Sequence, residues 1–288
     1  MDSELIQQIR NQARDLLESG AVKGIIGYER ASDGLTARPF FAYEPDAVER
    51  LIFDETCTHN LVKYLVDKKG ERMAILAKPC DSRALNLLIN EEQIKRDQVF
   101  IIGVYCPGVV ETSWNQKGQT QQPRCQTCQL LKPVVYDFLA GQEPARQPEA
   151  EVYSDIEEIE SMPTAERRAF WLEHLGRCIR CYACRQVCPG CYCPECFAEQ
   201  LDPAWVGIRI APEENELWQT IRTLHLAGRC IGCNECERAC PVDIPLSRLN
   251  RKLEKQVAQL FEFRAGLSPD EQPPFATFNK EERLGSEE

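Results

Sequence analysis

Two patterns of hydrophobic and polar residues organise the first third of the chain. Residues 4–19 carry apolar side chains at the spacing of an amphipathic helix, and the helical pattern ends at Gly20. Apolar runs of strand length follow at Gly24–Tyr28, Met73–Lys78 and Val99–Tyr105. We therefore expect one N-terminal helix and three buried strands.

Helical segments are predicted between these strands. One lies around Asn60–Lys68. A second, Ala84–Ile94, follows Pro79-Cys80-Asp81-Ser82, which supplies the proline and capping residues of a helix start. A strand, a helix and a strand in succession form a βαβ unit. The pattern thus predicts an α/β N-terminal domain with a small, mostly parallel sheet.

The C-terminal half is predicted to be helical and contains an internal repeat. Residues 168–176 and 220–228 each form a helical pattern that ends in glycine and leads into a cysteine-rich loop. The second of these helices is predicted over Glu213–Ala227, and a further helix begins at Leu246.

These patterns divide the chain into four predicted segments. Residues 1–145 form the α/β domain, and residues 146–164, which are rich in Pro and Glu, form a linker. Residues 165–263 form the α-helical domain, and residues 264–288 form an extended tail.

Cysteine is the outlier in the composition, with sixteen in 288 residues. The N-terminus is polar, and no apolar stretch approaches the roughly 20 residues that a membrane-spanning helix needs. We expect a cytoplasmic protein whose thiols stay reduced, which makes metal binding the first interpretation of so many cysteines. The net charge of −11 argues against a nucleic-acid partner.

Each copy of the repeat contains the motif C-x2-C-x2-C-x3-C-P. The spacing lets a tight loop wrap three thiolates around one 4Fe-4S cluster, while the fourth cysteine binds the other cluster. Zinc sites usually use two CxxC pairs instead, so the spacing disfavours zinc. The predicted ligands are Cys178, Cys181, Cys184 and Cys240 for cluster 1, and Cys230, Cys233, Cys236 and Cys188 for cluster 2.

The connection between the two motifs, Pro189–Arg229, is long and includes a predicted helix. With Cys240-Pro-Val-Asp-Ile-Pro245 and the helix after it, this half resembles the α-helical ferredoxins of fumarate reductase iron–sulfur subunits and the heterodisulfide reductase small subunit. The resemblance covers residues 165–262 and implies an α-helical two-cluster ferredoxin domain.

Four further cysteines fall in the α/β domain. Cys80 and Cys106 each follow a predicted strand, at the edge where open α/β sheets place their ligands, and Cys125 and Cys128 form a CxxC loop. We predict that these four bind a third 4Fe-4S cluster. The alternative is that Cys80 and Cys106 are small buried residues, and that Cys125 and Cys128 form a separate redox or zinc pair.

The N-terminal half also resembles a known family. The segments Leu16–Gly20, Gly24–Glu29, Asn60–Leu65, Ala77–Leu85 and Ile101–Cys106, with the Cys125-x2-Cys128 loop, are similar to the coenzyme F-420 hydrogenase/dehydrogenase beta-subunit family. The resemblance spans residues 10–140. It implies electron relay through 4Fe-4S clusters, in many members to a flavin, and supports the third cluster. FAD is implied by the resemblance alone, because the chain has no G-x-G-x-x-G motif.

Four cysteines remain after these assignments. Cys191, Cys193 and Cys196 lie within six residues, and Cys57 is the only other unassigned thiol. Together they would complete a fourth site, for another cluster or for zinc. The alternative is that Cys57 is a buried helix residue and that a partner completes the Cys191–Cys196 loop.

The sequence therefore predicts an iron–sulfur electron-transfer subunit of a multi-subunit anaerobic oxidoreductase, of the hydrogenase, formate dehydrogenase or heterodisulfide-reductase-like kind. Its expected partners are a catalytic subunit and a flavoprotein. No nucleophile–base pair or phosphate loop is evident, so we do not expect a stand-alone catalyst. The alternative is a flavin-bearing subunit that itself reduces a hydride carrier.

Overall fold

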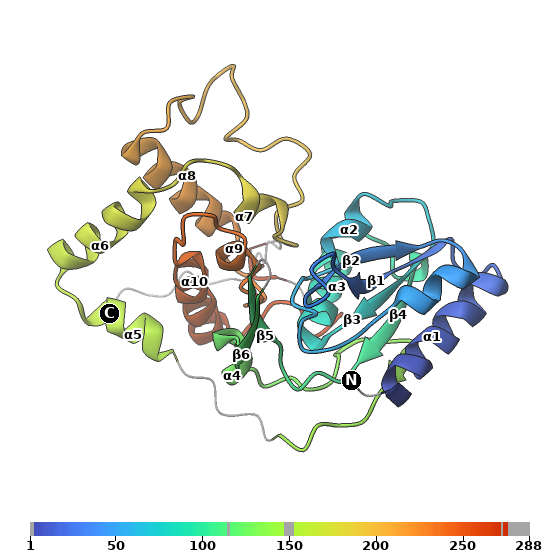
Figure 1. Ribbon diagram of the computed structural model, residues 1–288. Helices are drawn as coiled ribbons and strands as arrows, with labels where there is room; N and C mark the ends of the chain where they lie inside the picture. The colour runs from blue at the N-terminus through green and yellow to red at the C-terminus, as the bar shows by residue number, and fades with distance from the viewer. Residues whose placement is uncertain (1–2, 114–115, 147–152, 272, 276–288) are drawn as a thin grey trace.

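The computed structural model describes residues 3–113, 116–146, 153–271 and 273–275 (Figure 1). Its N-terminal part contains a five-stranded sheet of order β2-β1-β3-β4-β7. β2 runs antiparallel to β1, whereas β1, β3, β4 and β7 are mutually parallel. This confirms the predicted α/β class with a mostly parallel sheet. The strands are β1 (Gly24–Arg30), β2 (Ala37–Ala42), β3 (Met73–Ala77), β4 (Val99–Val104) and β7 (Phe138–Ala140).

The three strands predicted from apolar runs are present as β1, β3 and β4. The two outer strands were not predicted, because neither carries a long apolar run. β2 contains Pro39, which is tolerated at a sheet edge since an edge strand leaves one side unpaired. β7 has only three residues and pairs with the end of β4.

The helices around the sheet are α1 (Ser3–Glu18), η1 (Pro45–Arg50), α2 (Lys63–Val66), α3 (Pro79–Asn90) and η2 (Arg96–Gln98). The predicted helix at Asn60–Lys68 is present only as the single turn α2. The predicted helix at Ala84–Ile94 starts earlier, since α3 begins at Pro79, where the Lys78 backbone N–H donates to the Asp81 carboxylate at 2.9 Å. Cys80 therefore lies in the first turn of α3.

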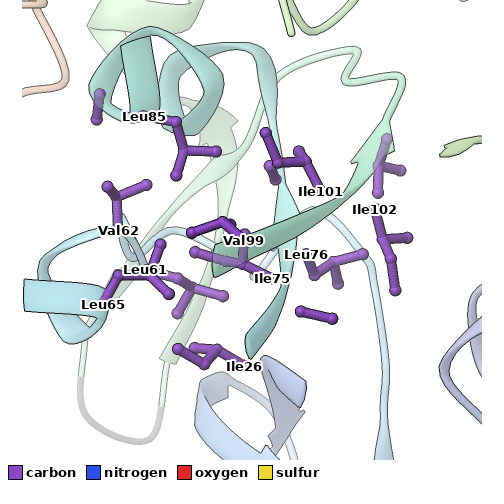
Figure 2. Packing of buried hydrophobic residues seen from close by; sticks show 14 of the residues in the cluster. Ile26, Leu61, Val62, Leu65, Ile75, Leu76, Leu85, Val99, Ile101 and Ile102 are labelled. Atoms are coloured by element: carbon purple, nitrogen blue, oxygen red, sulfur yellow. The ribbon is translucent and has the colours of Figure 1, made fainter. Parts of the chain in front are cut away.

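The main hydrophobic core surrounds the central strands. All five residues of β3 are buried, as expected of a parallel strand covered on both faces. Figure 2 shows Ile75 and Leu76 of β3 beside Ile101 and Ile102 of β4, with Leu85 of α3 packed on the same core. This rigid centre fixes the carboxyl ends of β3 and β4, which is where Cys80 and Cys106 follow.

A hairpin and a short helix lie between the sheet and the C-terminal helices (Figure 1). They are β5 (Val110–Ser113), β6 (Gln116–Gln121) and α4 (Pro123–Gln126). The C-terminal part contains α5 (Ser154–Ser161), α6 (Thr164–Gly176), α7 (Ala183–Gln186), α8 (Pro212–His225), α9 (Glu235–Arg238) and α10 (Leu246–Phe261). None of the helices in the described ranges is long and apolar enough to cross a membrane.

The C-terminal helices share a second, smaller core. Trp218 of α8 is buried against Tyr182, with their rings at 82° and 5.1 Å between centroids. α5 lies within the range 146–164 predicted as linker. Ile156 and Ile159 of α5 are buried, and its acidic residues pair with α10 through contacts such as Arg251–Asp155, at 2.6 Å. The end of this range is therefore helical and docked.

Part of the predicted tail is docked on α3. Arg83 Nε donates to the carbonyl of Ala265 at 2.9 Å, and Asn86 Nδ2 donates to that of Gly266 at 3.1 Å. Residues 276–288 of the predicted tail lie outside the described residues. The divisions at 145, 164 and 263 stay predictions.

Gly266 permits this docking, and its substitution should loosen the docked segment. Gly266 has φ +74°, and a Cβ there would lie 2.1 Å from the Arg83 carbonyl oxygen. We expect Gly266→Ala to cost about 1–3 kcal/mol and to speed hydrogen exchange of residues 265–271. Gly20→Ala is the matched control, because Gly20 has φ +67° but no atom within 4 Å of the added Cβ. Equal effects of the two variants would contradict a role for the close contact.

Candidate iron–sulfur sites

A cavity of about 440 Å³ lies where the carboxyl ends of β3 and β4 face the C-terminal helices. Its walls carry eight cysteines from two parts of the chain that are distant in sequence. They are Cys80, Cys106, Cys125 and Cys128 from the α/β part, and Cys188, Cys230, Cys233 and Cys236 from the helical part. The structure thus brings the cysteines predicted for cluster 2 and for cluster 3 to one cavity.

The four N-terminal cysteines are positioned by the sheet and by α4. Burial raises the pKa of the Cys106 thiol to about 11, and the neighbouring Cys125 and Cys128 add to this rise. Burial also raises the pKa of Cys80, with Cys106 acting in the same direction. Crowded, buried thiols resist ionisation unless a cation binds them, so this group suits a metal centre that takes up several thiolates.

The two motif loops have the same backbone conformation. Arg180 and Tyr182 in the first loop have φ of 49° and 59°, and Gly232 and Asn234 at the matching positions have 67° and 60°. A single helical turn follows each loop, as α7 and α9. Left-handed residues between the cysteines let each loop turn tightly within a few residues.

The fourth cysteine of each run lies beside the other run. Burial is the main cause that raises the pKa of Cys230, Cys233 and Cys236, and the nearby Cys188 raises it further. The charge of Cys240 acts in the same way on Cys178 and Cys184. Cys181 also acts on Cys178. These proximities match the crossed ligand sets predicted from the spacing, and the ligand roles themselves stay predictions.

Polar side chains from neighbouring helices point at these sulfur atoms. Gln219 of α8 places Nε2 3.9 Å from the sulfurs of both Cys178 and Cys184. Asn250 of α10 donates to the Cys236 sulfur at 3.5 Å. Such donors stabilise negative charge on cluster ligands, which is one way in which a protein sets a reduction potential.

Comparison with known proteins agrees with this geometry. The family model described as 4Fe-4S dicluster domain matches residues 177–245, which include both motif loops and the connection between them. The C-terminal region is a 4Fe-4S dicluster domain. It therefore provides for two 4Fe-4S clusters, as the motif spacing predicted.

The similarity extends beyond the dicluster domain. The chain is 24% identical to the F420-dependent formate dehydrogenase subunit beta of Methanocaldococcus jannaschii, over 90% of this chain and 91% of the relative. It is 23% identical to the F420-dependent formate dehydrogenase 1 subunit beta of Methanococcus maripaludis, over 90% of each chain. The chain is thus a distant full-length homologue of these beta subunits, which confirms the family resemblance of its N-terminal half.

A third relative matches a shorter region. The chain is 33% identical over 107 residues to the acetyl-CoA decarbonylase/synthase complex subunit alpha 1 of Methanosarcina acetivorans, which is 36% of this chain and 11% of that protein.

The structure places the remaining four cysteines in different surroundings, and one of them, Cys196, packs against the smaller core of the C-terminal part. Cys57 is fully buried in the core of the α/β part, where burial raises the pKa of its thiol to about 12. Cys191 is close to Cys188, while Cys193 is exposed. Within the residues that the structure describes, no three His, Cys, Asp or Glu side chains are arranged to hold a single metal ion. The fourth site stays a prediction, and the surroundings of Cys57 are those expected of a small buried side chain.

Buried charges beside the cavity were only partly evident in the sequence. Lys78, two residues before Cys80, is 1% exposed and pairs with Asp81 at 2.8 Å. Although burial alone would lower it, Asp81 and Tyr28 hold the pKa of Lys78 above its ordinary value. Sequence patterns did not point to the buried pair of Arg124 and Glu235, which joins the α/β part to the dicluster domain. The one trace of this pair in the sequence is that Arg124 directly precedes Cys125 and that Glu235 lies between Cys233 and Cys236.

Proposed function

We propose that this chain is an electron-relay subunit of a multi-subunit oxidoreductase of the formate dehydrogenase type. It would carry three 4Fe-4S clusters, two in the dicluster domain and one on the cysteines at the sheet edge. The observation that carries this proposal is the single cavity lined by eight cysteines of both parts. We further propose that it works in a cytoplasm where thiols remain reduced.

When bound, 4Fe-4S clusters accept and release single electrons at potentials set by their surroundings. The chain's own residues supply those surroundings. Cys125, Cys233 and Cys236 are buried from solvent, and Gln219 and Asn250 donate hydrogen bonds to thiol sulfurs. Because both cysteine sets line the same cavity, the path between them is short.

The opposite end of the dicluster domain is suited to a protein partner. Cys181, predicted for cluster 1, is exposed, and the neighbouring Ile179 is 49% exposed. Buried Arg180 donates to the carbonyls of Gly207 and Arg209, which ties this loop to a segment with exposed apolar side chains. Those side chains are Leu201, Trp205, Ile208 and Ile210. An accessible cluster ligand beside apolar surface supports electron exchange with another subunit here, either the catalytic subunit or a flavoprotein.

A variant of the assembled complex tests the relay. In a complex purified anaerobically with its catalytic subunit, we expect Cys230→Ser to abolish formate-driven reduction of the F420 acceptor. Direct reduction of a viologen dye at the catalytic subunit should continue, because that reaction does not need this chain. Native mass spectrometry confirms that the variant complex retains all its subunits. F420 reduction at the wild-type rate would contradict the relay.

A second candidate function is favoured by the names of the two full-length relatives, which are F420-dependent. In it, this chain binds a flavin and itself reduces a hydride carrier such as F420. The flavin content of the purified chain, measured after acid extraction, distinguishes the two functions. One flavin per purified chain, together with F420 reduction by the reduced chain alone, would support the second function. Absence of flavin from active complexes that lack a separate flavoprotein would exclude it.

A further inference from the structure

Arg124 lies at the junction between the two cysteine sets that share the cavity. It belongs to α4 and immediately precedes Cys125. Its side chain is 8% exposed and faces Glu235, which lies between Cys233 and Cys236 and is 2% exposed. The distance from Arg124 Nη1 to Glu235 Oε1 is 3.3 Å.

The guanidinium is held from two sides. Nη2 donates to the carbonyl of Thr58 at 2.8 Å, which anchors Arg124 to the α/β part. Glu235 is held in turn by Arg238, whose Nη2 lies 2.7 Å from Glu235 Oε2 and 3.1 Å from His59 Nδ1. The position of the cation is therefore fixed by both parts of the protein.

One nitrogen of this fixed cation has no hydrogen-bond partner among the described residues. This nitrogen is Arg124 Nε, which is buried, and Arg124 is part of the cavity wall. A buried N–H donor without a partner costs about 1–3 kcal/mol, so its retention favours an acceptor in the cavity. The sulfide and thiolate sulfurs of a bound cluster are acceptors of this kind.

The charge of Arg124 reaches both cysteine sets. It lines the cavity together with Cys80 and immediately precedes Cys125, and both cysteines belong to the third set. Its ion-pair partner Glu235 lies between Cys233 and Cys236, which belong to the second set. A cation that stabilises thiolate charge also stabilises the electron added on reduction, because both are negative charges in the same low-dielectric space.

We propose that Arg124 sets the reduction potentials of the two clusters that face each other across the cavity, with Glu235 partly offsetting its charge. This rests on the proposed function, since it requires clusters at these cysteines. Arg124 would hold both clusters at higher potentials than a neutral side chain at this position would. It would leave the more distant cluster of Cys178, Cys181, Cys184 and Cys240 unchanged.

Charge variants distinguish this role from a simple structural tie. Arg124→Gln and Glu235→Gln both break the same ion pair but leave opposite charges behind. Potentiometric titration of the anaerobic full chain, followed by electron paramagnetic resonance, gives the potential of each cluster. We expect R124Q to disfavour reduction of the two facing clusters about tenfold, which is about 59 mV lower for a one-electron couple. We expect E235Q to raise the same two potentials and R124K to keep them near the wild-type values.

Separate controls test whether the variants fold and whether the wild-type chain carries the clusters. The folding control is Arg96→Gln, which breaks the ion pair between Arg96 and Asp137, at 2.5 Å, close to the first residue of β4. This variant should shift none of the cluster potentials. If R124Q does not retain iron, E235Q and R124K decide the question, since both keep a cation at position 124. Shifts of the same sign in R124Q and E235Q, or no shift in E235Q, would overturn the proposal. A wild-type chain without iron would instead overturn the proposed function.

Discussion

Replacing Lys78 by methionine is expected to lower the free energy of unfolding by about 3–5 kcal/mol. Lys78 and Asp81 are 1% and 0% exposed, so the substitution leaves the Asp81 carboxylate buried without its cation. It also removes the hydrogen bond from Lys78 Nζ to the His59 carbonyl, at 2.8 Å. Anaerobic urea denaturation followed by far-ultraviolet circular dichroism measures the loss.

The double variant Lys78→Met/Asp81→Leu is the control for this prediction. Replacing both members of a buried pair by apolar residues is often nearly neutral, whereas breaking the pair is not. The double variant loses the hydrogen bond from the Lys78 backbone to Asp81 at the start of α3, which costs about 1 kcal/mol. It should therefore be more stable than the single variant. A double variant as unstable as K78M would show that the ion pair is not the cause.

Removal of iron is expected to unfold the dicluster domain and to leave the sheet folded. The smaller core contains nine buried residues, three of which are the cysteines Cys178, Cys184 and Cys236. Without metal these thiols add little to the core, and metal binding supplies much of the folding free energy of such sites. The core around β3 and β4 is several times larger and includes few predicted ligands.

Hydrogen exchange of the chelator-treated chain measures this difference by segment. Amides of α6, α8 and α10 should lose their protection, while those of β3 and β4 should keep it. The Trp218→Ala variant with its iron intact is a useful comparison, because it weakens the same core by about 3–5 kcal/mol without removing metal. Full protection of α8 and α10 after iron removal would contradict the prediction.

The local patterns of the chain predicted the centre of the fold well. Strands β1, β3 and β4 are continuous apolar runs because both faces of a parallel sheet are covered, and such runs are visible in a single sequence. β2 and β7 were not visible, since their pairing depends on neighbours distant in sequence. The extent of helix around Asn60–Lys68 was overestimated, because most of that segment is held by tertiary contacts of Leu61 and Val62 rather than by helical hydrogen bonds.

At the candidate site too, local patterns revealed the nearby contacts and missed those between distant parts of the chain. The motif spacing was sufficient to predict two clusters, because three cysteines at x2 spacing restrict a short loop to very few structures. Strand ends pointed to Cys80 and Cys106 as neighbours. Nothing local could show that these cysteines face Cys230 and Cys233 across one cavity, or that Arg124 meets Glu235 there. Those contacts join segments more than a hundred residues apart and depend on how two cores pack together.

The central claim is that the sheet-edge cysteines hold a third cluster that faces the dicluster domain. The most direct measurement is the iron and acid-labile sulfide content of anaerobically purified wild-type chain beside its Cys125→Ser variant. Three clusters predict about twelve irons with equal sulfide in the wild type, and about eight in C125S. About eight irons in both proteins would contradict the claim and leave two clusters only.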